Sequence, residues 1–376
     1  MHELVEIGMG RSARRAYGLD QVEIVPSRRT RSSSDVSTAW QLDAYRFDIP
    51  LITHPTDAVV SPTTAVTIGK LGGLAVLNAE GLWARHADTD AVLAQVVQAA
   101  DADDPTAATR LLQQLHGALI QPELLAAALG QVRDAGVTVA ARVSPQRALQ
   151  LTPGLLAAGV EILVVQGTII SAEHVSRENA EPLDLRHFIA DLDVPVVAGG
   201  VGDYRTAMHL MRTGAAGVIV GYGESVATTT DAVLGIGAPM ATAIVDAAAA
   251  RRDYLDETGG RYVHVIADGG ISGSGDIAKA IACGADAVML GEQLADAAEA
   301  PGRGLYWTSA AAHPSLPRSE VAGFAATGVD LQTVLFGPSA SPYGTVNLFG
   351  ALRRALAKSG YSDLKEFQRV NLTVRG

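Results

Sequence analysis

Eight short apolar runs alternate with stretches of helical character between residues 49 and 291, and this alternation most constrains the fold. The runs are rich in Val, Ile, Leu and Ala. Strands buried on both faces have this composition, and their alternation with helices indicates parallel pairing. The expected strands are Ile49–Thr53, Gly73–Leu77, Val137–Val143, Ile162–Gln166, Val194–Gly200, Gly217–Gly221, His264–Asp268 and Ala287–Gly291.

Eight strand–helix units over about 240 residues are the number at which a parallel sheet closes on itself. A doubly wound open sheet uses fewer strands and carries a G-x-G-x-x-G turn after the first one, and no early strand here is followed by that turn. The sequence therefore predicts an α/β fold, a single-domain (β/α)8 TIM barrel over residues 49–300. We expect an irregular arm over 1–48, a flap-like segment over 301–345 and C-terminal helices over 346–376.

Charge and cysteine content exclude several classes of function. A formal net charge of -11 gives no basic surface for nucleic acid. No run reaches membrane-spanning length, and the N-terminus lacks a signal-peptide core. The single cysteine, Cys283, excludes an intrachain disulfide and falls in a helical pattern, where a small core residue is expected. We expect a cytoplasmic protein with neither nucleic-acid nor membrane partners.

The ends of the strands carry the candidate chemistry, because the active site of such a barrel lies at their carboxyl ends. The loop over 221–239 follows the sixth strand and offers glycines and three consecutive threonines, although a plain Gly/Thr turn would look the same. The seventh and eighth strands end in Asp268-Gly269-Gly270 and Gly291, where many barrels bind phosphate through backbone N–H groups. Asp268 could bond a ribose diol there, or it could be a turn aspartate.

Three segments resemble the IMP dehydrogenase/GMP reductase family. They are IPLITHPTDAV at 49–59, VVAGGVGDYRTAMHLMRTGAAGVIVGYG at 196–223 and VIADGGISGSGDIAKAIACGADAVMLGEQLADAAEAPG at 265–302. The resemblance extends from about Tyr17 to Gln368. The usual family member also carries a paired regulatory CBS module, for which residues 85–135 are too short. The chain therefore resembles the CBS-less, IMP-dehydrogenase-related branch.

The resemblance implies oxidation of IMP to XMP with NAD, a step of GMP biosynthesis, by a homotetramer. In the family, a cysteine of the sixth loop attacks the purine, hydride passes to NAD, and water releases the adduct. A gapless match places Thr228 at the cysteine position, with Thr230 in the threonine pair that follows. A threonine hydroxyl needs an adjacent base to act as a nucleophile. The resemblance also places Gly200, Gly221 and Gly223 on the cofactor side. It further implies a monovalent cation such as K+ on the carbonyls of Gly223, Ser225 and Thr228.

Substrate contacts follow from the same resemblance, but several of these positions depart from the family pattern. The family's serine before its Pro-Met-Asp becomes His54, and the aspartate that ends its fourth strand is absent beside Gln166. Its phosphate-binding serines fall on Val226 and Glu292, and Glu224 adds a second acid, which would repel a phosphate. The Arg-Tyr pair of the family's flap is absent from residues 302–345. The implied contacts are His54, Thr56, Asp57, Ser225, Asp268, Gly269, Gly270, Gly291 and Glu292.

Three functions follow from these residues. The first is an IMP-dehydrogenase-like enzyme in which His54, Glu224 or Glu292 assists an attacking water. The second is a non-catalytic barrel that binds a purine nucleotide such as IMP and acts as a sensor or as the partner of a true dehydrogenase. The third is a flavin oxidoreductase, because FMN-dependent barrels share the Asp-Gly-Gly and Gly phosphate grip.

Overall fold

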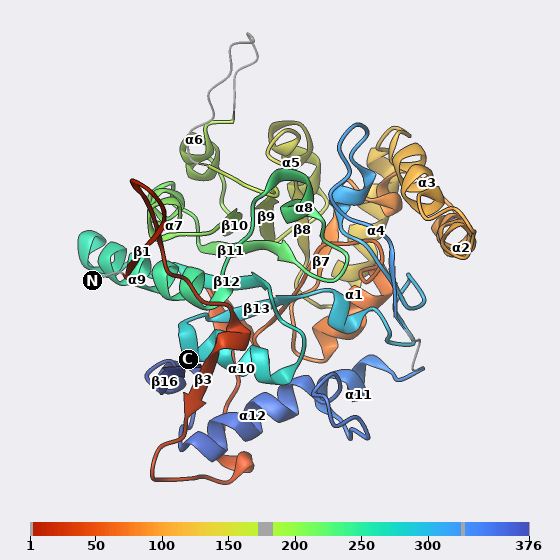
Figure 1. Ribbon diagram of the computed structural model, residues 1–376. Coiled ribbons are helices and arrows are strands. Elements are labelled where there is room, and N and C mark those ends of the chain that lie inside the picture. Colours follow the sequence, from red (N-terminus) through yellow and green to blue (C-terminus); the bar gives the residue numbers. More distant parts are fainter. Residues whose placement is uncertain (1–2, 172–182, 325–327, 376) are drawn as a thin grey trace.

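The computed structural model, which describes residues 3–171, 183–324 and 328–375, contains a ring of eight parallel strands (Figure 1). Neighbours pair in the order β6-β13-β12-β11-β10-β9-β8-β7, and a parallel bridge from Ile52 to Leu74 joins β6 to the segment leading into β7. The predicted (β/α)8 barrel is therefore confirmed. Its strands are β6 (Leu51–Thr53), β7 (Val76–Asn78), β8 (Ala140–Val143), β9 (Ile162–Gln166), β10 (Val196–Val201), β11 (Gly217–Glu224), β12 (His264–Gly269) and β13 (Ala287–Leu290).

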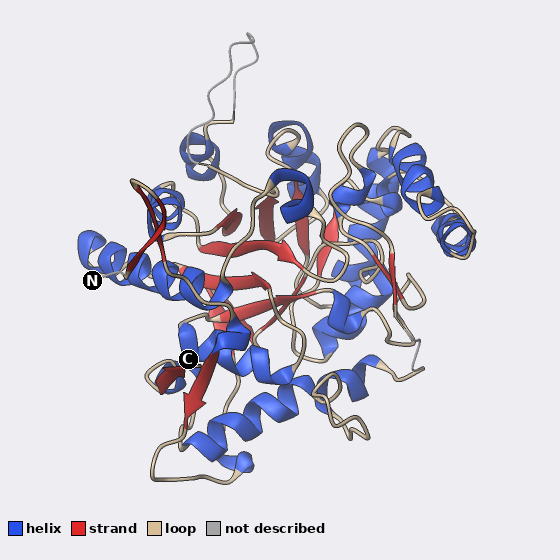
Figure 2. Cartoon of the chain, in the orientation of Figure 1, coloured by secondary structure: helices blue, strands red, loops and turns tan. Residues whose placement is uncertain are grey.

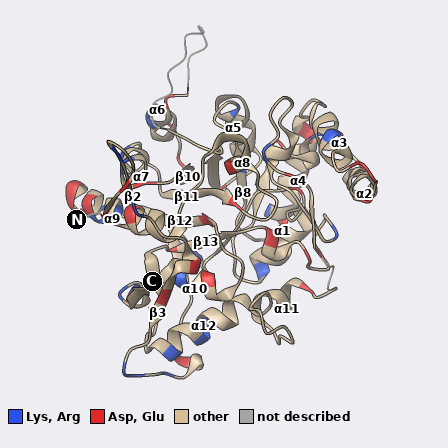
Figure 3. Cartoon of the chain, in the orientation of Figure 1, with Lys and Arg blue, Asp and Glu red and all other residues tan. Residues whose placement is uncertain are grey.

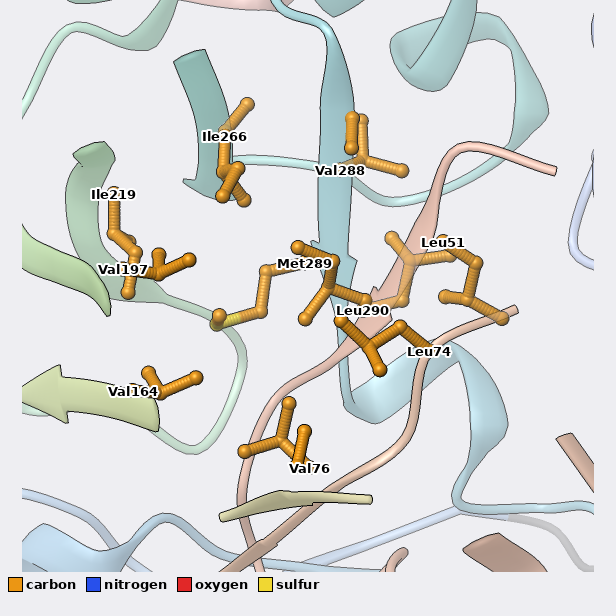
Figure 4. Close-up of a cluster of buried hydrophobic side chains, with 14 of the residues drawn as sticks. Leu51, Leu74, Val76, Val164, Val197, Ile219, Ile266, Val288, Met289 and Leu290 are labelled. Carbon is orange, nitrogen blue, oxygen red and sulfur yellow. The ribbon is translucent and has the colours of Figure 1, made fainter. Parts of the chain in front are cut away.

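Apolar side chains of the strands form the core of the barrel. Figure 4 shows side chains from strands on opposite sides of the ring converging around Met289. None of the labelled side chains is more than 3 % exposed, so both faces of each strand are covered and the apolar runs are unbroken. The labelled residues are Leu51, Leu74, Val76, Val164, Val197, Ile219, Ile266, Val288, Met289 and Leu290.

Helices cover the outside of the ring (Figure 2). The longest, α9 (Met240–Thr258), buries Ala243, Ala247 and Ala250 completely, and these small side chains let it lie close to its neighbours α7 and α10. The other helices up to the eighth strand are α1 (Pro62–Lys70), α2 (Thr89–Ala100), α3 (Ala107–His116), α4 (Pro122–Asp134), α5 (Ala148–Ala157), α6 (Leu185–Ala190), α7 (Tyr204–Arg212), α8 (Thr230–Leu234) and α10 (Ser274–Cys283).

The N-terminal arm was predicted to be irregular, but its residues take part in three antiparallel strand pairs. A hairpin joins β1 (Leu4–Gly8) to β2 (Arg11–Arg14), and a second joins β4 (Trp40–Leu42) to β5 (Tyr45–Phe47). The third strand, β3 (Val22–Val25), pairs with β16 (Asn371–Val374) at the other end of the chain. Such short strands give little alternation to detect, and the partner of β3 is distant in sequence. The same pairing corrects the prediction for 346–376, which contains α12 (Leu348–Ser359) and α13 (Leu364–Phe367) but ends in a strand.

The segment over 301–345 packs against the carboxyl end of the barrel. It contains two paired strands, β14 (Leu305–Tyr306) and β15 (Ala322–Gly323), and the helix α11 (Leu331–Phe336). Two backbone hydrogen bonds tie it to the sixth loop: Thr229 N–H donates to the carbonyl of Arg318, and Glu320 N–H to that of Ala227, both at 2.9 Å. The predicted flap-like segment therefore lies over the candidate site.

A buried ionic cluster ties the opposite end of the barrel together. Asp286, which precedes β13, accepts hydrogen bonds from Arg251 at 2.7 Å, from the hydroxyl of Tyr262 at 2.8 Å and from Lys365. Burial alone would raise the pKa of Asp286, but Arg251 and Lys365 hold this pKa well below its usual range. Burial also lowers the pKa of His264, beside this cluster, to about 4.

We expect Asp286→Ala to lower the free energy of unfolding by about 3–5 kcal/mol, because it leaves a buried guanidinium without its counter-charge. Urea denaturation at pH 7 measures the loss. Glu257→Ala is the matched control, since it breaks an exposed pair with Arg212 and should change stability far less. Equal losses in the two variants would show that the cluster does not hold the barrel together.

The pH dependence of stability provides a second test of the buried groups at this end of the barrel. His264 has a lower pKa folded than unfolded, so protonation favours the unfolded chain, and stability should fall as pH drops from about 6.5 to about 4. His264→Gln should lose less stability than the native protein over that interval. Urea denaturation midpoints at pH 7 and pH 5 measure the loss of stability in each protein. Equal losses in the native protein and in His264→Gln would contradict the assignment of this pH dependence to His264.

Candidate active site

A cavity of about 680 Å³ opens at the carboxyl end of the barrel, where the parallel strands bring their last residues together. Figure 3 shows charged residues scattered over the outer helices and along the chain around the ring of strands. Close approach of β11 and β12 shapes the wall, because a Cβ on Gly221 would lie 2.1 Å from the carbonyl oxygen of Asp268. The predicted site residues that line this cavity are His54, Gly221, Gly223, Thr228, Thr230 and Asp268.

His54 and Asp268 form a buried pair in the wall of the cavity. His54 Nδ1 lies 3.2 Å from Asp268 Oδ1, and the amide of Gln166 donates to Asp268 Oδ2 at 2.8 Å. His54 follows β6 directly, Gln166 ends β9 and Asp268 is the last residue but one of β12, so rigid strands fix their positions. A carboxylate that accepts from Nδ1–H leaves Nε2 of the imidazole as a proton acceptor. His54 and Gln166, which both differ from the family pattern, therefore belong to one hydrogen-bonded unit with Asp268.

Thr228 has no base within hydrogen-bonding distance. Its hydroxyl donates to the carbonyl of Gly223 at 2.5 Å and lies 2.9 Å from the hydroxyl of Ser225. In the described part of the chain, no imidazole or carboxylate contacts it, so it is not activated as a nucleophile. Thr230 is buried at the first turn of α8. Cys283 lies in the core, and burial raises the pKa of its thiol to about 12, which excludes it as a substitute.

Carboxylates fill the point where the resemblance places the nucleotide phosphate. Glu292 accepts the backbone N–H of Val226 at 2.8 Å. Glu224 accepts the N–H of Tyr222 at 3.1 Å and that of Ala238 at 2.8 Å. The N–H of Val226, which the resemblance places at the phosphate, thus already donates to an anion of the protein itself.

Little space remains beside these carboxylates. A cavity of about 10 Å³ is left, roughly the volume of one water. The N–H of Gly270 donates to the carbonyl of Glu224, and that of Gly291 to the side chain of Gln293. Burial raises the pKa of both Glu224 and Glu292, and in the described part of the chain neither carboxylate forms an ion pair with a cationic side chain. The predicted residues that line this small cavity are His54, Gly223, Ser225, Asp268, Gly269, Gly291 and Glu292.

Four predicted residues line neither cavity: Thr56, Asp57, Gly200 and Gly270. Thr56 donates its hydroxyl to the carbonyl of Trp307 and so anchors the 301–345 segment. Asp57 accepts the N–H of Leu82 at 3.0 Å and lies 3.4 Å from His116 Nε2, just behind the cavity. The suggested cation ligands are partly engaged, since the carbonyls of Gly223 and Ser225 accept hydrogen bonds from Thr228.

The cavity also contains residues that the sequence did not single out. Arg142 is the last residue but one of the third expected strand, and the strand-end rule could have identified it. Arg85, Arg147 and Arg318 come from loops and from the 301–345 segment, and no motif marks them. Across the described residues, no group of three His, Cys, Asp or Glu side chains could hold a metal ion.

Comparison with known proteins identifies the family. A family model of the IMP dehydrogenase/GMP reductase domain matches residues 16–313. The chain belongs to the IMP dehydrogenase/GMP reductase family. A relative in Mycolicibacterium smegmatis is 67 % identical over 374 residues, 99 % of this chain and 100 % of the relative, and is named an uncharacterized oxidoreductase. A relative in Mycobacterium tuberculosis with the same description is 65 % identical over 376 residues.

Named enzymes of the family are more distant. The inosine-5′-monophosphate dehydrogenase of Aquifex aeolicus is 39 % identical over 162 residues, which are 43 % of this chain and 31 % of that enzyme. An IMP dehydrogenase/GMP reductase-like protein from Corynebacterium glutamicum has a crystal structure with a TM-score of 0.95 and 56 % identity, covering 99 % of this chain and 98 % of that one. This protein is thus an oxidoreductase of the family. None of its helices in the described ranges has the length and apolar character needed to cross a bilayer.

We expect Glu292→Ser to bind IMP about tenfold more tightly than the native protein, because it frees the N–H of Val226 for a phosphate and removes a repelling charge. Isothermal titration calorimetry measures both affinities. Glu123→Ser on the exposed face of α4 makes the same change in net charge and should leave IMP binding unaltered. Equal affinities for the native protein and Glu292→Ser would show that Glu292 does not block this position.

Proposed function

We propose that this protein is an oxidoreductase that acts by acid–base catalysis through His54 and Asp268 and uses NAD, without a covalent adduct at residue 228. The His54–Asp268 pair is the observation that supports this most directly, because it places a proton acceptor in the wall of the large cavity. The substrate is a small molecule with a hydroxyl group that is oxidised to a carbonyl.

His54 takes the proton in this reaction. As the carbon–oxygen bond of the substrate becomes a double bond, the hydroxyl proton moves to Nε2 of His54, and the hydrogen on the same carbon leaves with two electrons. Asp268 stabilises the imidazolium that forms and holds the ring in one tautomer through Nδ1–H. Gln166 keeps the carboxylate in place from the other side. General acid–base catalysis of this kind contributes about 10²–10⁴-fold to a rate.

The residues of the cavity fit a nicotinamide cofactor. Gln166 Oε1 is buried without a hydrogen-bond partner, and an acceptor in that position suits the amide hydrogens of a carboxamide. When bound, the nicotinamide supplies a two-electron hydride acceptor. We therefore assign NAD to the cavity, with Gln166 as one residue that would hold it. The glycines Gly221 and Gly223 line the same cavity and leave its wall open.

Oxidation of IMP by the route of the family should be very slow here. Loss of the nucleophile alone lowers the rate of a covalent mechanism by several orders of magnitude. The phosphate position is also filled by Glu224 and Glu292. Both changes act against the same reaction, whereas neither affects proton transfer at His54.

The proposal is tested with a deproteinised metabolite extract of Mycolicibacterium smegmatis, fractionated by charge and incubated with NAD and the native protein. We expect one fraction to produce NADH at 340 nm, and His54→Gln to lower that rate by about 10²-fold or more. His187→Gln is the matched control, because His187 pairs with Asp184 on the surface and belongs to no cavity described here.

Two results would contradict the proposal. One is the absence of any fraction that reduces NAD in the presence of the native protein. The other is NADH formation that His54→Gln leaves unchanged. Rapid NADH formation from purified IMP would instead favour the family's own reaction with a different nucleophile.

A further inference from the structure

We infer that the end of the cavity lined by Arg142, Arg147 and Arg318 is a binding subsite for a phosphate or pyrophosphate group of the ligand. The inference gives the chemical class of the ligand that the large cavity binds. It rests on the proposed function only for the location of that ligand in the cavity. The subsite lies at the ends of β8 and β9, away from the phosphate position of the family at the ends of β12 and β13.

Glu80 holds two of the arginines side by side. Its Oε1 lies 3.5 Å from Arg142 Nη1 and its Oε2 lies 3.4 Å from Arg147 Nε. Arg142 also donates to the carbonyl of Gln166 at 2.6 Å, which fixes its guanidinium at the end of β9. The terminal nitrogens of Arg147 have no partner within the described ranges, so they are available to an anion.

Arg318 approaches the same point from the 301–345 segment. Its Nη2 donates to the hydroxyl of Thr168 at 3.2 Å, two residues after the carbonyl that Arg142 contacts. Its Nε is buried without a hydrogen-bond partner. Buried polar atoms are rarely left unpaired, and a phosphate oxygen would give this donor an acceptor.

The local charge is unbalanced in favour of the arginines. Arg85 joins the other three in lining the cavity, and the carboxylates that line it with them are Glu80 and Asp268, while Asp57 acts on Arg85 and Arg142 from behind it. Four guanidinium groups therefore share the cavity with two carboxylates, one of which, Asp268, is paired with His54, in a chain whose net charge is -11. Repulsion between Arg147 and Arg85 is part of this excess. An anion would relieve it, and guanidinium groups bind phosphate oxygens with two parallel hydrogen bonds.

Isothermal titration of the full-length protein with inorganic pyrophosphate at constant ionic strength tests the subsite. We expect saturable binding, and we expect Arg147→Gln and Arg318→Gln each to weaken it by about tenfold. Arg133→Gln is the matched control, because Arg133 pairs with Asp134 on the surface, does not line the cavity and should bind like the native protein. Circular dichroism establishes that the variants fold.

Competition then identifies the source of the phosphate. Displacement of pyrophosphate by NAD assigns the subsite to the dinucleotide, and displacement by ribose 5-phosphate but not by NAD assigns it to the substrate. Absence of pyrophosphate binding, or equal weakening in Arg133→Gln, would overturn the inference. Because titration requires no turnover, pyrophosphate binding can succeed where the metabolite assay fails, and the two proposals are tested separately.

Discussion

The hydrogen bonds that Glu292 and Glu224 accept from the loops around β11 and β13 determine what this barrel can bind. They satisfy the N–H groups of Tyr222, Val226 and Ala238. A backbone donor buried without a partner is costly, so a carboxylate in this place stabilises the loops in the absence of any anion. We propose that the same bonds keep phosphate out, since little volume remains and the charge has the wrong sign.

Other changes in the site are consistent with that constraint. The positively charged groups of the large cavity instead include Arg142 at the end of β8 and Arg147 just after it, with Arg85 and Arg318 in the same lining. The nucleophile of the family is replaced by a threonine whose hydroxyl stabilises its own loop. Proton transfer can instead use His54, which Asp268 and Gln166 orient. The barrel and its strand ends are those of the family, whereas several of the groups placed on them depart from its pattern.

The fold could be predicted from the sequence because its eight strands are buried on both faces and are therefore unbroken apolar runs. The strands of the N-terminal arm could not be predicted, because β3 pairs with β16 at the far end of the chain and carries no local signal of that partner. In the site, the strand-end rule located His54 and Asp268, but their contact depends on the closure of the ring. Glu224 and Glu292 were predicted to repel a phosphate, whereas their role as acceptors for backbone N–H groups required the loop geometry. Arg318 comes from a segment without regular pattern and could be placed only by the fold.

A crystal structure of the native protein with IMP and NAD would test the central claim most directly, because it shows where the nucleotide phosphate lies. We expect the bond between Glu292 and the N–H of Val226 to remain, and no phosphate within hydrogen-bonding distance of Gly270 or Gly291. Phosphate density between Gly270 and Gly291, with the carboxylate of Glu292 displaced, would show that the carboxylates do not close this position.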